Sequence, residues 1–329
     1  MTRHFLEVDD LSAAELADVV VRAEQPVAAS ADRLRARSVA LLFEKASART
    51  RNSSEVAVAQ MGGHPVTIQA GEVGLDSRES VEDVARTLGC YHLAIGARVN
   101  EHSTVERMAR ALDQAGVVVP VVNLLSDLGH PCQAIADVLT VRQALGGTAG
   151  VKLAYVGDAN NVCRSLALAA AMSGMEMRVA APPGYGPSEQ DRDRVAGLGG
   201  SLAVFDRPEP AVEGADVVYT DVWVSMGQES DQDQRLADFE GFGVDQRLMA
   251  LAAPGAVVLH CLPAHRGLEI SAEVVDGTAS RVWEQAANRM HAMRGLLWWL
   301  ADQVDLEVTP GSDRRPEGDR NHRPERDRD

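Results

Sequence analysis

Ser47-Ala48-Arg49-Thr50-Arg51 decides the fold, because it stands where a buried strand gives way to a helix. The apolar run 39–43 before it has the length and β-branching of a buried strand. The run 52–61 after it, closed by a glycine pair, predicts a helix with Val56, Ala57 and Met61 on its buried face. The first turn of a helix offers unpaired N–H groups and a positive dipole end to an anion. The hydroxyls and guanidiniums of this stretch therefore predict a phosphate site, and the alternative is an ordinary N-cap at Ser47 with solvated arginines.

Length and charge limit the class of protein. A chain of 329 residues indicates two domains, and a net charge of −16 argues against a nucleic-acid partner. An anionic substrate would then need a local cluster of positive charge. The four cysteines form no C-x-x-C pair, so neither a disulfide framework nor a metal site is expected. No apolar run is long enough to span a membrane and no signal-peptide pattern opens the chain, so we expect a cytoplasmic protein without a membrane partner.

Short apolar runs alternate with helical or turn-rich stretches along most of the chain. This alternation predicts an α/β fold in which parallel sheets are flanked by helices on both faces. We expect two domains, 1–134 and 135–286, with a C-terminal helix at about 287–305 packed back on the first. The apolar-poor stretch 309–329 predicts a disordered tail. The expected strands cover 39–43, 64–68, 93–98, 117–124, 151–156, 177–181, 202–205, 217–219 and 256–259.

Polar side chains follow several of these strands, at the sheet edge where α/β folds bind ligands. Arg98 ends one strand. His130-Pro131-Cys132-Gln133 follows the next, and its proline places His130 and Gln133 at one helix start. From local features alone, Arg98 could be a surface arginine and His130 a structural histidine. After the strand 151–156, the pattern G-x-G-x-x-G is absent, so a bound dinucleotide is not expected.

Four motifs in a fixed order resemble the signatures of the carbamoyltransferase family. They are the arginine stretch 47–51, His-Pro-x-Gln at 130–133, Asp-x-Trp-x-Ser-Met-Gly at 221–227 and His-Cys-Leu-Pro at 260–263. The resemblance runs from about residue 5 to residue 300. The Ser-Met-Gly element is similar to that of the ornithine-specific branch, as opposed to the aspartate-specific one.

This resemblance implies two α/β domains with the active site in the cleft between them, and carbamoyl transfer to L-ornithine without metal or organic cofactor. Carbamoyl phosphate would be bound by Ser47, Ala48, Arg49, Thr50, Arg98, His130, Gln133, Leu262 and Arg289. Ornithine would be bound by Asn161, Asp221, Ser225, Met226 and Cys261. Thr50, Arg98, His130, Cys261 and Arg289 would take part in catalysis, with Cys261 lining the ornithine side chain and not acting as a nucleophile. The family also implies a homotrimer, or a multiple of trimers, in which the loop 71–80 reaches a neighbouring subunit.

Five positions depart from the family pattern by lacking a polar group that is expected near the site. They are Ala48, Gly74, Val84, Val222 and Ala287. Two alternatives therefore stay open beside an ornithine enzyme in arginine biosynthesis or a related pathway. The chain could transfer the carbamoyl group to another amine, or it could be a catalytically weak paralogue that only binds.

Overall fold

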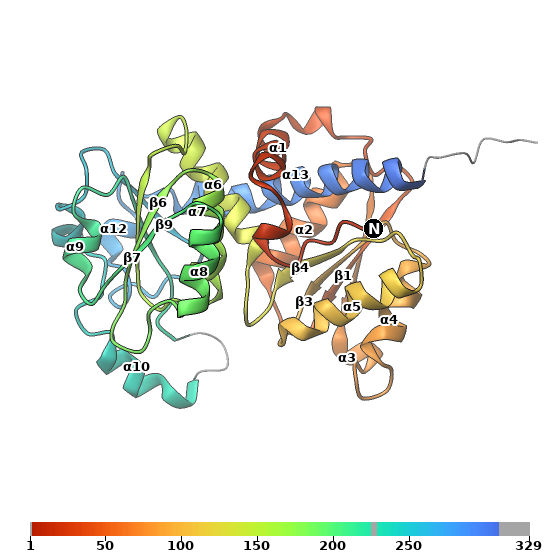
Figure 1. Cartoon of the computed structure of the whole chain (residues 1–329), viewed down its shortest axis with the longest axis horizontal. Helices are drawn as coiled ribbons and strands as arrows, with labels where there is room; N and C mark the ends of the chain where they lie inside the picture. The colour runs from red at the N-terminus through yellow and green to blue at the C-terminus, as the bar shows by residue number, and fades with distance from the viewer. Residues whose placement is uncertain (1, 225–228, 309–329) are drawn as a thin grey trace, which may run out of the picture.

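The computed structural model describes residues 2–224 and 229–308 and contains two parallel sheets, each covered by helices (Figure 1). The α/β class expected from the alternating apolar runs is confirmed, and every expected strand is present. The predicted tail 309–329 lies outside the described residues.

The first sheet is four-stranded, with the order β2-β1-β3-β4. Its strands are β1 Ser38–Phe43, β2 His64–Gln69, β3 Ala94–Arg98 and β4 Val121–Leu125. All three pairings are parallel, and Phe43 lies in register with Arg98. This register brings the arginine stretch after β1 and the arginine at the end of β3 to the same edge of the sheet.

Helices cover both faces of this sheet because the side chains of β1 alternate between two cores. Val39, Leu41 and Phe43 face one core and Ala40 and Leu42 the other. The first face is covered by α1 Ala13–Glu24, α2 Ala48–Gln60 and α13 Val282–Val308; the second is covered by α4 Val81–Gly89 and α5 His102–Gln114.

The second sheet is five-stranded, with the order β7-β6-β5-β8-β9 and parallel pairing throughout. Its strands are β5 Lys152–Val156, β6 Glu176–Ala180, β7 Leu202–Phe205, β8 Val217–Thr220 and β9 Val257–His260. One face carries α7 Asn161–Met172 and α8 Glu189–Gly197, and the other carries α9 Pro208–Val212, α10 Gln232–Asp238, α11 Gln246–Met249 and α12 Ala272–Val275.

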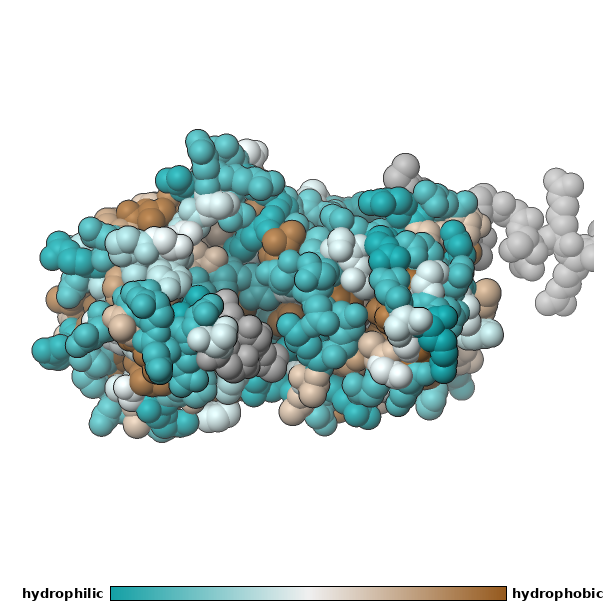
Figure 2. All heavy atoms as spheres, turned by 90° about the horizontal axis from the view of Figure 1, so that it is seen from below, coloured by the Kyte–Doolittle hydropathy of each residue, from teal (hydrophilic) through white to brown (hydrophobic). Residues whose placement is uncertain are grey.

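Two long helices join the halves. Helix α6 Pro131–Leu145 runs from the first sheet to the second, and α13 packs against α1, α2 and α6, so that it spans both halves in Figure 1. Their buried residues belong to one core that continues from the first half into the second. The face in Figure 2 is mostly hydrophilic, and within the described residues no helix has the length and hydropathy of a membrane span.

Two local expectations are wrong. The strand expected over 117–124 begins at Val121, directly after Pro120, whose nitrogen cannot donate to a strand partner. Val56 is 43% exposed. The buried positions of α2 are Thr50, Ser54, Ala57 and Val58, which fall at helical spacing on the opposite side from Val56.

Candidate active site

A cavity of about 970 Å³ lies between the carboxyl edges of the two sheets and is lined by residues from both halves of the chain. Most of the expected site residues line it: Ser47, Ala48, Arg49, Thr50, Arg98, His130, Asn161, Asp221, Cys261, Leu262 and Arg289. Gln133 does not line the cavity but is buried behind Arg289, which does. Ser225 and Met226 lie outside the described residues.

The start of α2 forms one end of the cavity. Ser47 is the N-cap, and its hydroxyl accepts from the backbone N–H of Thr50 at 3.2 Å. Ser47 is therefore the N-cap that the alternative interpretation expected, and it also lines the cavity. The two arginines differ: Arg49 lines the cavity, whereas Arg51 forms an ion pair with Glu55 at 2.8 Å.

Buried polar side chains meet beside Thr50 at the floor of the cavity. Nη2 of Arg289 donates to Oγ1 of Thr50 at 2.8 Å, and Nη1 of Arg98 donates to the same oxygen at 3.4 Å. Nη1 of Arg289 also lies 3.4 Å from Nε2 of His130 and donates to Oε1 of Gln133. All five side chains are at most 8% exposed. Segments from α2, β3, α6 and α13 thus meet at one point.

Electrostatics at this point favour an anionic ligand. Burial, then the charges of Arg289 and Arg49, lower the pKa of Arg98 to about 10. Burial and the same arginines, with Arg98, hold the pKa of His130 well below its usual range, so its imidazole is neutral. Within the described residues, no carboxylate forms an ion pair with Arg49, Arg98 or Arg289, and the Nε atoms of Arg98 and Arg289 are buried without partners. An anion with several oxygens would supply the missing acceptors.

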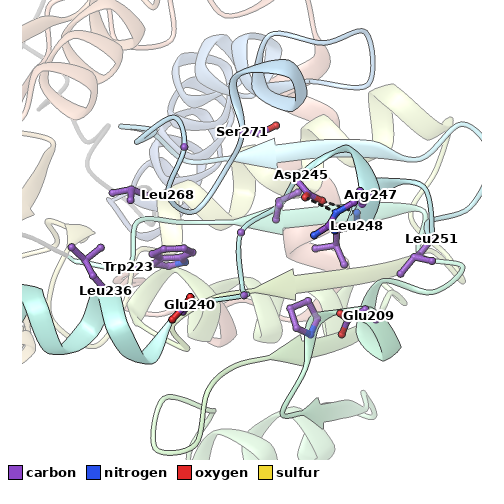
Figure 3. A pocket seen from close by; sticks show the side chains of 15 residues that line it. Glu209, Trp223, Leu236, Glu240, Asp245, Arg247, Leu248, Leu251, Leu268 and Ser271 are labelled. Carbon is purple, nitrogen blue, oxygen red and sulfur yellow. Dashed lines mark hydrogen bonds and ion pairs between the residues drawn. The ribbon is translucent and has the colours of Figure 1, made fainter.

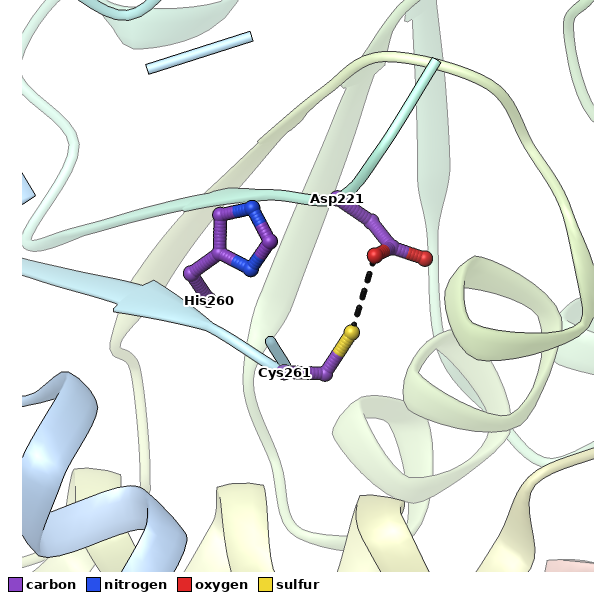
Figure 4. A group of neighbouring side chains, drawn as sticks. All are labelled: Asp221, His260 and Cys261. Carbon is purple, nitrogen blue, oxygen red and sulfur yellow. Dashed lines mark hydrogen bonds between the residues drawn. The ribbon is translucent and has the colours of Figure 1, made fainter. Parts of the chain in front are cut away.

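The opposite wall, in the second half, offers acceptors and a thiol. Asp221 follows β8 and accepts from Nδ2 of Asn160 at 2.9 Å and from Sγ of Cys261 at 2.9 Å (Figure 4). One amide N–H of Asn161 is used by the Ser126 carbonyl at 2.7 Å, which leaves the other for a ligand. Burial, then Asp221, raises the pKa of the Cys261 thiol well above its usual range, so the thiol is a donor and not a nucleophile.

Asp221, His260 and Cys261 also lie close enough together to hold a metal ion. Both nitrogens of His260 are already used: Nδ1 accepts from the Leu262 N–H at 2.9 Å, and Nε2 lies 3.1 Å from a Glu269 oxygen. The trio in Figure 4 therefore offers no free imidazole nitrogen, and its hydrogen bonds account for its geometry.

The five departures from the family pattern do not all lie near the cavity. Ala48 and Val222 line it. Val84 belongs to the core beneath the first sheet, and Ala287 is exposed on the far side of α13, two residues and roughly 200° from Arg289. The expectation that Val84 and Ala287 lie near the site is wrong.

Gly74 is another of these departures, and the backbone conformation at this position explains why it is a glycine. It ends α3 Ala70–Val73 with φ +66°, and a Cβ there would lie 2.8 Å from the Cβ of Arg78. A larger residue would be strained in this left-handed conformation. No residue of the loop 71–80, all of which is described, lines the cavity of its own chain.

The sequence analysis missed an ion pair, between a buried arginine and a partly buried aspartate, in the cavity wall of the second half. Asp158, just beyond β5, binds the guanidinium of Arg235 in α10. Nε of Arg235 donates to the Trp223 carbonyl at 2.5 Å, and its guanidinium lies 4.9 Å from the Tyr185 ring. The pair supports the segment that follows Asp221. Asp158 could have been found from its position after a strand, whereas nothing in the helix around Arg235 marks that residue.

A second cavity, of about 700 Å³, lies behind Trp223 and is drawn in Figure 3. It shares Trp223, Leu236 and Leu268 with the first cavity. Its charged side chains are exposed or paired: Asp245 lies 3.3 Å from Arg247, whose side chain is 94% exposed. None of the expected site residues lines it. The cavity between the sheets is therefore the candidate site.

Comparison with known proteins matches both halves of the chain. Residues 3–143 match the carbamoyl-P binding domain of aspartate/ornithine carbamoyltransferase, and residues 149–300 match its Asp/Orn binding domain. A protein of Parafrankia sp. named ornithine carbamoyltransferase is 47% identical over 316 residues, covering 93% of this chain and 98% of the relative. Its counterpart in Acidothermus cellulolyticus is 48% identical over 309 residues, with coverages of 92% and 97%. The crystal structure of ornithine carbamoyltransferase from Thermus thermophilus superposes with a TM-score of 0.82 at 41% identity, covering 92% of this chain and 99% of that one.

Proposed function

The chain belongs to the aspartate/ornithine carbamoyltransferase family, and we propose that it transfers the carbamoyl group of carbamoyl phosphate to the δ-amine of L-ornithine, giving L-citrulline and phosphate. The observation that carries the proposal is the buried cluster of Arg98 and Arg289 around Thr50, which faces the second domain across one cavity and in which neither arginine forms an ion pair with a carboxylate of the described residues. Its charge suits the phosphate substrate, and Asp221 on the opposite wall suits an ammonium group.

In this proposal, the first domain binds carbamoyl phosphate. Ser47, Arg49, Thr50 and Arg98 hold the phosphate at the start of α2, where backbone N–H groups add donors. Thr50, Arg98 and the neutral His130 donate to the carbonyl oxygen. The Gln133 oxygen and the Leu262 carbonyl accept from the NH₂ group, and Arg289, which can only donate, orients that group through its hydrogen bond to Gln133. Leu262 has φ +61°, a rare conformation for leucine, at the cavity wall.

The second domain would bind the amino acid. Asp221 accepts from the α-amino group, and the free N–H of Asn161 donates to the α-carboxylate. Cys261 lines the side chain, and Ser225 and Met226 would complete the head-group contacts. The neutral δ-amine attacks the carbonyl carbon, the C–O bond to phosphate breaks, and the departing phosphate takes the proton that the amine loses. Binding both substrates in one orientation and stabilising the charge on the carbonyl oxygen and the leaving phosphate would supply the rate enhancement.

We also propose a homotrimer, or a multiple of trimers. The loop 71–80 is folded around Gly74 but lines no part of its own chain's cavity, which supports a role at a neighbouring subunit. Light scattering coupled to size exclusion would test this, and a monomer that is fully active would contradict it.

A different amine acceptor is the second candidate, and Val222 favours it. This apolar residue adjoins Asp221 in the cavity wall, where the family pattern has threonine. The remaining alternative, a paralogue that only binds, would show tight binding of a bisubstrate analogue without turnover.

The test is product formation from carbamoyl phosphate with ornithine, Nα-acetylornithine, putrescine, lysine and aspartate. Citrulline from ornithine, at a kcat/KM at least about a hundredfold above that for any other amine, is the expected result. Preference for another amine would support carbamoyl phosphate as the donor and overturn L-ornithine as the acceptor. No phosphate release with any amine would contradict transferase function.

A further inference from the structure

A buried carboxylate lies directly behind Gln133. Asp137 stands one helical turn further along α6 and is 1% exposed. Its Oδ1 accepts from Nε2 of Gln133 at 2.8 Å and from Nε2 of Gln285 at 2.7 Å, while Oδ2 accepts from the Tyr219 hydroxyl at 3.2 Å. None of these contacts reaches the cavity, so Asp137 does not touch the substrates.

The amide of Gln133 lies between two unlike neighbours. Arg289 can only donate, so it requires the oxygen Oε1 on its side, and Oδ1 of Asp137 accepts, so it requires the nitrogen on the other side. Only one of the two amide orientations satisfies both. With Asp137 removed, the orientation would depend on Arg289 alone.

The amide of Gln285 is oriented in the same way, by contacts that reach the second domain. Its Oε1 accepts from the backbone N–H of His260 at 2.8 Å, which turns Nε2 towards Asp137 and towards the Tyr219 hydroxyl at 3.1 Å. Asp137 is therefore tied to β8 and to the end of β9. Through these bonds one carboxylate connects the carbamoyl-orienting residues to the ornithine-binding domain.

We infer that Asp137 is a positioning residue for carbamoyl transfer, because its Oδ1 holds the Gln133 amide with the oxygen towards Arg289 and the substrate NH₂ group. This inference rests on the proposed function. A Gln133 amide turned by 180° would present N–H donors to both Arg289 and the carbamoyl N–H, where no acceptor remains.

The protonation state of Asp137 does not alter this role. Burial raises its pKa to about 7, against the lowering effects of Gln133, Gln285, Tyr219 and the charge of Arg289. Among the described residues, the thiol of Cys261 also interacts electrostatically with Asp137. A proton on Oδ2, towards Tyr219, leaves Oδ1 free to accept from both amides.

The test compares Asp137→Leu and Asp137→Asn with a matched control, Thr140→Val. Thr140 lies on the same helix and is equally buried, and its hydroxyl accepts from Nδ2 of Asn288 at 2.9 Å without contacting the Gln133 network. We expect D137L to lower kcat at least tenfold while the ornithine KM changes less than about threefold. D137N, which keeps an acceptor oxygen, should restore kcat to within about threefold of wild type, and T140V should retain kcat despite a lower Tm.

Each other outcome has a defined meaning. A D137L enzyme with wild-type kcat, or a D137N enzyme as slow as D137L, would overturn the inference. If D137L is recovered unfolded, D137V, whose smaller apolar side chain also offers no acceptor, carries the same expectation, and a loss of more than tenfold in D137N would again overturn the inference. A wild-type enzyme without carbamoyl transfer would refute the proposed function, whereas an active wild type with an indifferent Asp137 refutes this inference alone.

Discussion

Arg289 donates to the hydroxyl of Thr50 across 2.8 Å, although 239 positions separate the two residues in the chain. The contact depends on α13, which begins beneath the second sheet and returns over α1 and α2 of the first. A helix from the end of the sequence thus completes a site that begins with the first strand. The candidate site therefore requires the docking of both domains, and not only the folding of the first.

Arg98→Met should abolish most activity without lowering stability. The Arg98 side chain is 5% exposed, its one hydrogen bond within the described ranges is to Thr50 at 3.4 Å, and burial lowers its pKa to about 10. Folding therefore carries an uncompensated desolvation cost that methionine removes. Loss of its charge at the reacting carbonyl should reduce kcat by roughly 10²–10³, and Tm should stay level or rise.

The control for that variant is Arg235→Met, which removes a buried arginine that does have a partner. Asp158 would be left without its cation, so stability should fall by about 3–5 kcal/mol. Thermal unfolding of both variants, alongside steady-state kinetics, separates the two cases. A large drop in the Tm of R98M would show that Arg98 serves the fold.

Ala48→Thr should strengthen phosphate binding. Ala48 is the first residue of α2 and lines the cavity, where a hydroxyl would add a donor beside the phosphate. A hydrogen bond to a charged group contributes roughly 1.5–3 kcal/mol, so the KM for carbamoyl phosphate should fall by up to about tenfold to a hundredfold. The inhibition constant of inorganic phosphate should fall in parallel. An unchanged inhibition constant would mean that backbone N–H groups already satisfy the phosphate.

Cys261→Ser should keep kcat within about tenfold of wild type. The thiol donates to Asp221 at 2.9 Å, and its pKa is raised well above the usual range, so it stays protonated near neutral pH. Serine keeps the donor, whereas a catalytic nucleophile would not tolerate the change. Alkylation supplies an independent readout: iodoacetamide should modify the exposed Cys90 first. Loss of kcat by a thousandfold in C261S would indicate covalent catalysis.

The parallel sheets could be predicted from the sequence because buried strands are short, β-branched and separated by helices. The residues at their carboxyl ends, among them Arg98, Asn161 and Asp221, could be predicted for the same reason, since parallel strands end at one edge. Their motifs then indicated which edge residues belong together.

Side-chain direction was harder to predict. Val56 and Ala287 both occupy helices next to the site but point away from it, because a displacement of one or two residues rotates a side chain by 100–200°. Asp137 and Arg235 were not recognised. Helical spacing could have placed Asp137 beside Gln133, four residues earlier on the same helix. Its bond to Gln285 and the pairing of Arg235 with Asp158 join residues far apart in the chain, and sequence spacing carries no information on such pairs.

In the wild type, the contribution of Asp137 to the free energy of unfolding should decrease as the pH rises from about 4 to 7. Asp137→Asn should remove this pH dependence. Burial raises the pKa of Asp137 from its ordinary 3.8 to about 7. Between these values the folded protein holds a proton that the unfolded chain has released, so raising the pH favours unfolding, by about 1.4 kcal/mol per pH unit for one group. This contribution is fully present below about pH 4 and lost above pH 7. Urea unfolding at pH 4.5, 5.5, 6.5 and 7.5 measures it as the difference between D137N and wild type, in which carboxylates common to both cancel. A difference that stays constant over this range would mean that Asp137 is already ionised at pH 4.5, with its three hydrogen bonds outweighing burial.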